Sequence, residues 1–71
     1  MNEREIARVI SEALGDLHKN ETLERALGRF VRRYRGNYED YLEIISSIRD
    51  LAQRKRIDLI EAARRIAASH D

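Results

Sequence analysis

The sequence predicts an all-α fold, a compact array of four helices that self-associates. Apolar residues recur along the chain at the spacing i, i+3, i+4, i+7, which places them on one face of a helix. The chain has no proline and only 3 glycines, so few residues interrupt helices. Its 71 residues form a single helical domain, residues 1–71, with a core near the size at which oligomerisation commonly adds stability.

The first predicted helix covers residues 3–17. Its apolar face comprises Ile6, Val9, Ile10, Ala13, Leu14 and Leu17. Asn2 is the expected N-cap, and Glu5 follows three residues later, where its carboxylate can complete a capping box. Both residues therefore place the start of this helix at about residue 3.

The second predicted helix covers residues 21–35 and repeats the same spacing. Its apolar face comprises Leu23, Ala26, Leu27, Phe30, Val31 and Tyr34. We expect Asn20 to be its N-cap, because a side-chain oxygen there can accept a hydrogen bond from a free amide group of the first turn. We expect Gly36 to stop the helix, because glycine adopts the left-handed backbone conformation that follows many C-caps.

The third predicted helix covers residues 38–54, and Asn37 is its expected N-cap. Its apolar residues spread over about half of the circumference, which is wider than a helix with one packed face requires. Such a helix contacts two neighbours, or one neighbour and a second copy of the chain. We therefore expect a homodimer or higher oligomer through this helix. The candidate interface residues are Tyr38, Tyr41, Ile44, Ile48, Arg49 and Leu51.

Arg49 is the unusual member of that set, because it falls inside the apolar sector of the helix. One interpretation is that its methylene groups cover Leu42 or Ile45 while its guanidinium stays in water. The other is that it lies at a subunit interface, where it pairs with a carboxylate or stacks on a tyrosine.

The fourth predicted helix covers residues 59–69. Asp58 is its expected N-cap, Glu61 occupies the third helical position, and Ile57 can pack on Ala62 as a hydrophobic staple. Its inward face comprises Leu59, Ile60, Ala63, Ile66 and Ala67. The linkers between the four helices are a few residues long, as is typical of one helical bundle.

Composition and charge argue against several classes of protein. The formal net charge of +1 is small for a protein that coats DNA. No apolar run approaches the roughly 18 residues of a membrane span, and the start, MNEREIARV, carries acids where a signal peptide carries basic residues. The absence of cysteine excludes disulfides and thiolate metal sites. We therefore expect a cytoplasmic protein.

The chain shows no pattern that is typical of an enzyme. Its two histidines, His18 and His70, fall near helix ends, where an imidazolium complements the helix dipole. No HExxH sequence, glycine-rich phosphate loop or other catalytic motif accompanies them. We therefore expect no catalytic residue, no metal site, no cofactor and no small-molecule substrate.

Arginines follow the outer side of the second helix. The dipole rule explains the arginines of its last turn, and it equally explains Glu39 and Asp40 at the start of the third helix. It leaves Arg25 and Arg29 unexplained, and these two either pair with protein carboxylates or meet phosphates. The candidate residues for contact with a polyanion are Arg25, Arg29, Arg32, Arg33, Arg35, Arg64 and Arg65.

Residues 51–67 partly resemble a helix-turn-helix. The residues at its small and apolar positions are Ala52, Ile57 and Ala62. Arg56 stands where the turn normally has glycine, and Lys55 stands where an apolar residue normally closes the first helix. A plain helical hairpin is the other interpretation of this segment.

The sequence favours a non-catalytic helical module for protein–protein interaction or assembly, or an accessory subunit. The alternative is a nucleic-acid-binding protein that uses the arginines of the second helix, with or without a degenerate helix-turn-helix. The two hypotheses differ in surface charge. Nucleic acid is favoured by a continuous basic face, whereas interleaved acids favour protein interaction. That face would combine Arg25, Arg29, Arg32, Arg54, Lys55 and Arg56.

Overall fold

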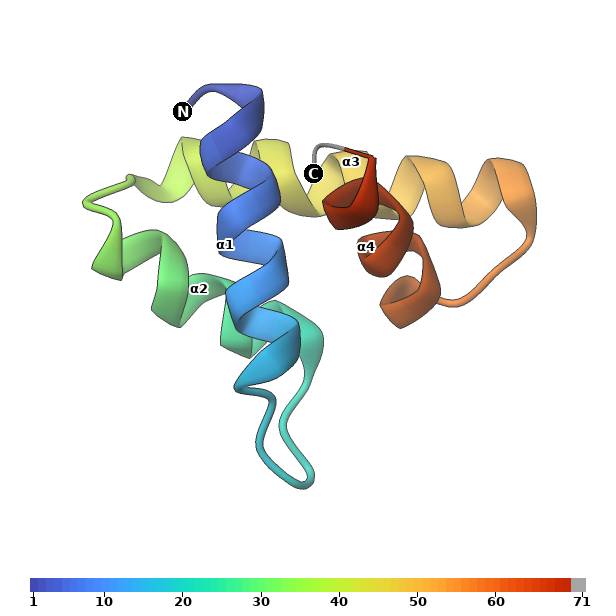
Figure 1. Ribbon diagram of the computed structural model, residues 1–71, viewed down its shortest axis with the longest axis horizontal. Helices are drawn as coiled ribbons and strands as arrows, with labels where there is room; N and C mark the ends of the chain where they lie inside the picture. The colour runs from blue at the N-terminus through green and yellow to red at the C-terminus, as the bar shows by residue number, and fades with distance from the viewer. Residues whose placement is uncertain (70–71) are drawn as a thin grey trace.

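The computed structural model describes residues 1–69 and contains four α-helices in this range, with no strand (Figure 1). The helices are α1 (Glu3–Gly15), α2 (Leu23–Arg33), α3 (Tyr38–Lys55) and α4 (Leu59–Ala68). The all-α four-helix prediction is confirmed, and each predicted helix end falls within two residues of the observed one.

The four helices pack into a body of 31 × 28 × 22 Å. Helix α1 lies between α2 and α4 and packs against both, while α3 packs against α4 and α2 (Figure 1). The N-terminal half of α3 runs beside α2, and its C-terminal half runs beside α4. Within residues 1–69, none of the helices is both long enough and apolar enough to cross a membrane.

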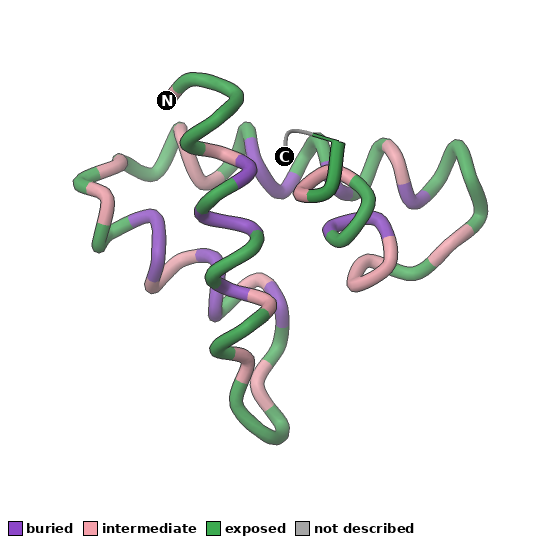
Figure 2. The backbone as a smooth tube through the Cα atoms, in the orientation of Figure 1, coloured by how far each residue is buried: buried purple, intermediate pink, exposed green. Residues whose placement is uncertain are grey.

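All four helices contribute to one core, and their buried segments face the centre of the molecule (Figure 2). The largest fully buried side chains are Val9, Ile10, Leu27, Ile44 and Ile48. Alanines complete the contact surfaces of α1 and α4, where Ala13, Ala62 and Ala63 have no exposed area. Small side chains let two helices approach closely, which explains the alanine-rich sequence of α4.

This burial corrects part of the expected oligomer interface. Ile44 and Ile48 are 1% and 0% exposed, so in this structure they are not available to a second chain. The wide apolar face of α3 has a simpler explanation, because the helix contacts two neighbours of its own chain, α2 and α4. Of the two alternatives that the sequence left open, the structure therefore supports contact with two helices.

The start of α1 follows the predicted capping box, and the predicted N-cap of α3, Asn37, also takes part in a capping box. The Asn2 side chain accepts a hydrogen bond of 2.8 Å from the amide of Glu5, and the Glu5 carboxylate accepts one from the amide of Asn2. Asn37 and Asp40 repeat the arrangement at α3, with both bonds at 2.9 Å. Each box satisfies two amide groups that have no partner inside the helix.

The start of α2 differs from the prediction. Its N-cap is Thr22, whose hydroxyl accepts a hydrogen bond of 3.2 Å from the amide of Arg25. Asn20 instead adopts a left-handed backbone with φ of 70° in the turn before the helix. Asparagine tolerates this conformation better than most residues, so its place in the turn moves the helix start by two residues.

The end of α2 also differs from the prediction. The left-handed residue is Arg35, with φ of 61°, and not Gly36. The amide of Gly36 donates to the carbonyl of Val31 at 2.8 Å and that of Arg35 donates to Arg32 at 3.0 Å, which together form a Schellman motif. Glycine is needed here for space, since a Cβ atom at Gly36 would lie 2.8 Å from Cγ1 of Val31.

The start of α4 carries a direct test of its cap. Asp58 accepts a hydrogen bond of 2.7 Å from the amide of Glu61, as predicted. We expect Asp58→Ala to lower the free energy of unfolding by about 1 kcal/mol, because one amide group of the first turn loses its acceptor. Thermal unfolding measures the change. Asp58→Asn keeps the acceptor and should retain most of the stability, whereas equal stability of the alanine variant would contradict this cap.

Candidate functional site

Arg29 is tied to the loop between α1 and α2. Its Nε and Nη2 donate to the two carboxylate oxygens of Glu21 at 3.1 and 2.7 Å. Its Nη1 donates to the carboxylate of Asp16 at 3.0 Å, and Nη2 also donates to the Asp16 carbonyl at 3.2 Å. The loop acids thus explain one of the two arginines that the helix dipole left unexplained.

These contacts change the proton affinities of all three groups. Hydrogen bonds from Arg29 hold the pKa of Asp16 and the pKa of Glu21 below their ordinary values, and the backbone amide of His18 lowers that of Glu21 further. The bonds to Glu21 and then to Asp16 raise the pKa of Arg29. Its guanidinium is therefore already hydrogen-bonded to acids of its own chain, and a phosphate could bind it only by displacing a carboxylate.

The other arginines of α2, namely Arg25, Arg32 and Arg33, are exposed, and so is Arg35 just after the helix. The guanidinium of Arg33 lies 5.0 Å from the centre of the Phe30 ring, and that of Arg29 lies 5.6 Å from it. Phe30 is only 4% exposed, so it offers no platform on which a nucleic-acid base could stack. Arg54 pairs with Asp50 at 3.2 Å. Of the six cations expected in a continuous basic face, Arg29 and Arg54 are therefore paired with acids, and no ion pair involves the other four within residues 1–69.

The hairpin of α3 and α4 has one feature of a helix-turn-helix. Arg56 has φ of 55° and ψ of 47°, the left-handed conformation usually supplied by glycine in that turn. Ala52 and Ala62 are buried as the motif requires, while Lys55 is exposed. On the outer side of α4, Arg64 and Arg65 are both exposed. Arg65 is paired with an acid of its own helix, Glu61, at 3.5 Å.

Two of the predicted interface residues do lie on the surface of α3 near α2. Tyr38 is 71% exposed and stacks on the half-buried Tyr41, with ring centres 6.0 Å apart. Leu42, one residue further on, is 44% exposed. Arg49 is exposed and Leu51 is half-buried further along the helix. The start of α3 therefore presents aromatic and aliphatic surface to solvent.

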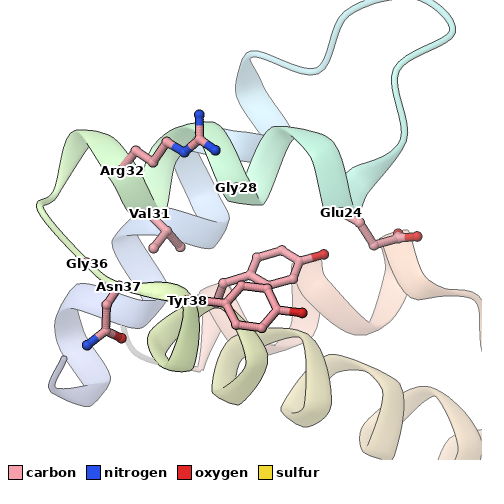
Figure 3. A pocket seen from close by; sticks show the side chains of 8 residues that line it. Glu24, Gly28, Val31, Arg32, Gly36, Asn37 and Tyr38 are labelled. Atoms are coloured by element: carbon pink, nitrogen blue, oxygen red, sulfur yellow. The ribbon is translucent and has the colours of Figure 1, made fainter.

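A groove of about 310 Å³ separates α2 from this part of α3 (Figure 3). It is lined by Glu24, Gly28, Val31, Arg32, Gly36, Asn37, Tyr38 and Tyr41. In Figure 3, Arg32 and Glu24 mark opposite ends of the groove, and the Tyr38 ring lies across from α2 with its hydroxyl toward the Glu24 end. The groove combines an apolar wall with one charge of each sign, so it can accept a side chain that is apolar along its stem and charged at its tip.

Gly28 is the residue in this groove that sequence reasoning overlooked. It stands in the middle of α2, where glycine costs about 0.5–1 kcal/mol relative to alanine. Its backbone is not left-handed, and a Cβ atom at this position would meet no atom within 4 Å apart from its adjacent residues and the backbone of its own helix. Neither conformation nor packing within the chain requires glycine here, and the missing side chain leaves the α2 side of the groove open.

Comparisons with protein families, curated proteins and solved structures found no match. Within the part of the chain that the structure describes, no three histidines, cysteines or acids gather as metal ligands would. The hydroxyl of Ser47 donates to the backbone carbonyl of Glu43, and that of Ser69 to the carbonyl of Ile66. His18 is exposed, and His70 lies outside the described residues.

Proposed function

We propose that this chain is a non-catalytic protein-interaction module whose binding surface is the α2–α3 groove with its rim. The observation that carries the proposal is the exposed Tyr38 ring, stacked on Tyr41 beside an open groove. Tyrosine and arginine are enriched where proteins bind each other, because both combine a large contact area with a polar group. Here Tyr38 and Arg32 line the same groove.

The charges on the rest of the surface support the same choice. Arg29 and Arg54 are each paired with an acid, so they do not extend a basic face along the molecule. Nonspecific binding to a nucleic acid rests mainly on cations that neutralise phosphates, and it benefits from exposed rings that stack on bases. In this chain the exposed Tyr38 ring instead lies beside a groove that carries one acid, Glu24, and one arginine, Arg32.

Site-specific photo-crosslinking tests the proposal. The photoreactive amino acid p-benzoylphenylalanine replaces Tyr38 in the native host, and crosslinked products are identified by mass spectrometry. A matched variant carries it at Ser47, which is exposed on the opposite side of α3. We expect crosslinks to protein from position 38 and not from position 47. Equal crosslinking at both positions, or none at position 38, would contradict the proposed surface.

Nucleic-acid binding is the second candidate, and the left-handed Arg56 in the α3–α4 turn is the observation in its favour. Fluorescence anisotropy with duplex DNA, single-stranded DNA and RNA tests it. Sub-micromolar binding at physiological salt that weakens in Arg64→Glu, but not in Arg4→Glu, would make this the primary function. Weak binding that moderate salt abolishes is the result we expect, because the formal net charge is only +1 and both Arg29 and Arg54 are paired with acids of the chain.

A further inference from the structure

Three residues on one flank of α2 form a symmetric pattern. Glu24 precedes Gly28 by four residues, and Arg32 follows it by four, so all three lie on one stripe of the helix. The acid and the base are about 12 Å apart along the helix axis, with glycine midway between them. Neither Glu24 nor Arg32 forms an ion pair with another residue in the range 1–69.

When two copies of this stripe lie antiparallel, the acid of each copy lies opposite the base of the other. We propose that the α2–α3 groove binds a second copy of this chain, about a two-fold axis that passes beside Gly28 and sets the two α2 helices antiparallel. Such an axis places Glu24 of each copy opposite Arg32 of the other, which forms two equivalent ion pairs. The proposal rests on the proposed function, because it names the partner of the same surface.

Gly28 has a role in this arrangement that it lacks in one chain. The distance between two packed helices depends on the side chains at their crossing point, and glycine permits the closest approach. At Gly28 the outer surface is open, since beyond the adjacent residues and the backbone of its own helix no atom lies within 4 Å of where its Cβ would be. The loss of helix stability that this glycine causes in the monomer is then balanced by contact between the two α2 backbones.

The groove also suits the arginine of the second copy. An arginine directed at Glu24 would pass along the groove wall that Tyr38 and Tyr41 form, and guanidinium groups bind well against tyrosine rings. Figure 3 shows the Tyr38 hydroxyl directed toward the Glu24 end, where that guanidinium would lie. Arg25 lines a different pocket, together with His18 and Lys19, and is not among the residues that line the α2–α3 groove.

Charge exchange tests the two-fold pairing through analytical ultracentrifugation of the full chain over a range of micromolar concentrations. The wild type should show a dimer, at twice the monomer mass of 8.4 kDa. Glu24→Arg or Arg32→Glu alone places like charges together at both symmetric sites, so we expect the dissociation constant to rise about 10-fold or more. The chain with both exchanges should dimerise again, and an equal mixture of the two single variants should form a heterodimer.

Gly28 provides a second test that does not depend on charge. Gly28→Gln should remain as helical as the wild type by circular dichroism, since the site is open and glutamine favours helices, yet it should be monomeric. A wild type that stays monomeric at every concentration overturns the proposal. So do single charge variants that dimerise like the wild type, or a mixture that does not recover the dimer.

Crosslinking at position 38 separates the failure of this inference from the failure of the proposed function. A crosslinked product of two identical chains supports both. Crosslinks to a different protein, with the wild type monomeric, keep the interaction module and overturn self-association. The absence of any protein crosslink at position 38 overturns both.

Discussion

Ile48→Ala is expected to lower the free energy of unfolding by about 2–5 kcal/mol. Ile48 is 0% exposed in the core, so its truncation removes buried methyl groups and leaves a cavity. A domain of this size has a total stability of roughly 4–11 kcal/mol, at about 0.05–0.15 kcal/mol per residue. The substitution therefore removes a large share of the stability, and urea denaturation followed by circular dichroism should show a much lower midpoint.

Leu42→Ala is the matched control on the same helix. Leu42 is 44% exposed, so its truncation should change the stability of the monomer by no more than about 0.5 kcal/mol. If instead Ile48→Ala gave a fully stable chain that had only lost self-association, Ile48 would be an intermolecular contact. That result would restore the interface first predicted from the apolar pattern of α3.

The contrast between these two residues explains how far the sequence could predict α3. Helical periodicity depends only on local spacing, so it identified the helix, its N-cap Asn37 and its wide apolar sector. It could not say whether α2 and α4 or a second chain cover Ile44 and Ile48. Which helix covers which face depends on contacts between residues distant in sequence, and the spacing within one helix carries no such information.

The two ends of α2 show a local limit of the same kind. Asn20 and Thr22 are both good N-caps, and Arg35 and Gly36 both stand where a left-handed residue can end the helix. The turns around these residues determine which candidate lies at each end of the helix. Asn20 adopts the left-handed conformation in the turn before α2, and Gly36 is packed against Val31. Propensity ranked the candidates, but tertiary packing selected among them.

The candidate site was partly accessible from the sequence. Tyr38 was predicted as a candidate interface residue of α3, but the groove beside it could be found only from the structure, since α2 forms the opposite wall. The sequence did contain a signal for this site. Gly28, the central glycine of α2, has Glu24 four residues before it and Arg32 four residues after it. The partners of Arg29 could not have been found this way, because Glu21 and Asp16 precede it by 8 and 13 residues, beyond the reach of helical spacing rules.

Arg29→Met is expected to lower the stability of the chain at neutral pH and to reduce its dependence on acid. The substitution keeps a long apolar stem but removes the hydrogen bonds to Glu21 and Asp16. Glu21 matters more than Asp16, because its pair with Arg29 is bidentate and its side chain is only 9% exposed, against 52% for Asp16. Solvent and salt weaken the more exposed contact first.

The pH dependence follows from the direction of the two pKa shifts. In the folded chain Arg29 lowers the pKa of Glu21 and of Asp16 below their ordinary values of 4.5 and 3.8. The stability that these carboxylates contribute is therefore present above those values, and it is lost as the pH falls through the lowered pKa values. Thermal unfolding between pH 7 and pH 2 should show a steeper loss of stability in the wild type than in Arg29→Met.

Arg64→Met is the control for this experiment, because Arg64 is exposed on α4 and forms no ion pair with any other residue of the described range 1–69. It should match the wild type in both stability and acid dependence. High salt should narrow the difference between the wild type and Arg29→Met at pH 7, as expected for partly exposed ion pairs. If Arg29→Met kept the full acid dependence, other carboxylates would be its source. In that case the ion pairs of Arg29 would contribute little stability, so a phosphate could replace its two carboxylate partners at little cost, which would favour the nucleic-acid hypothesis.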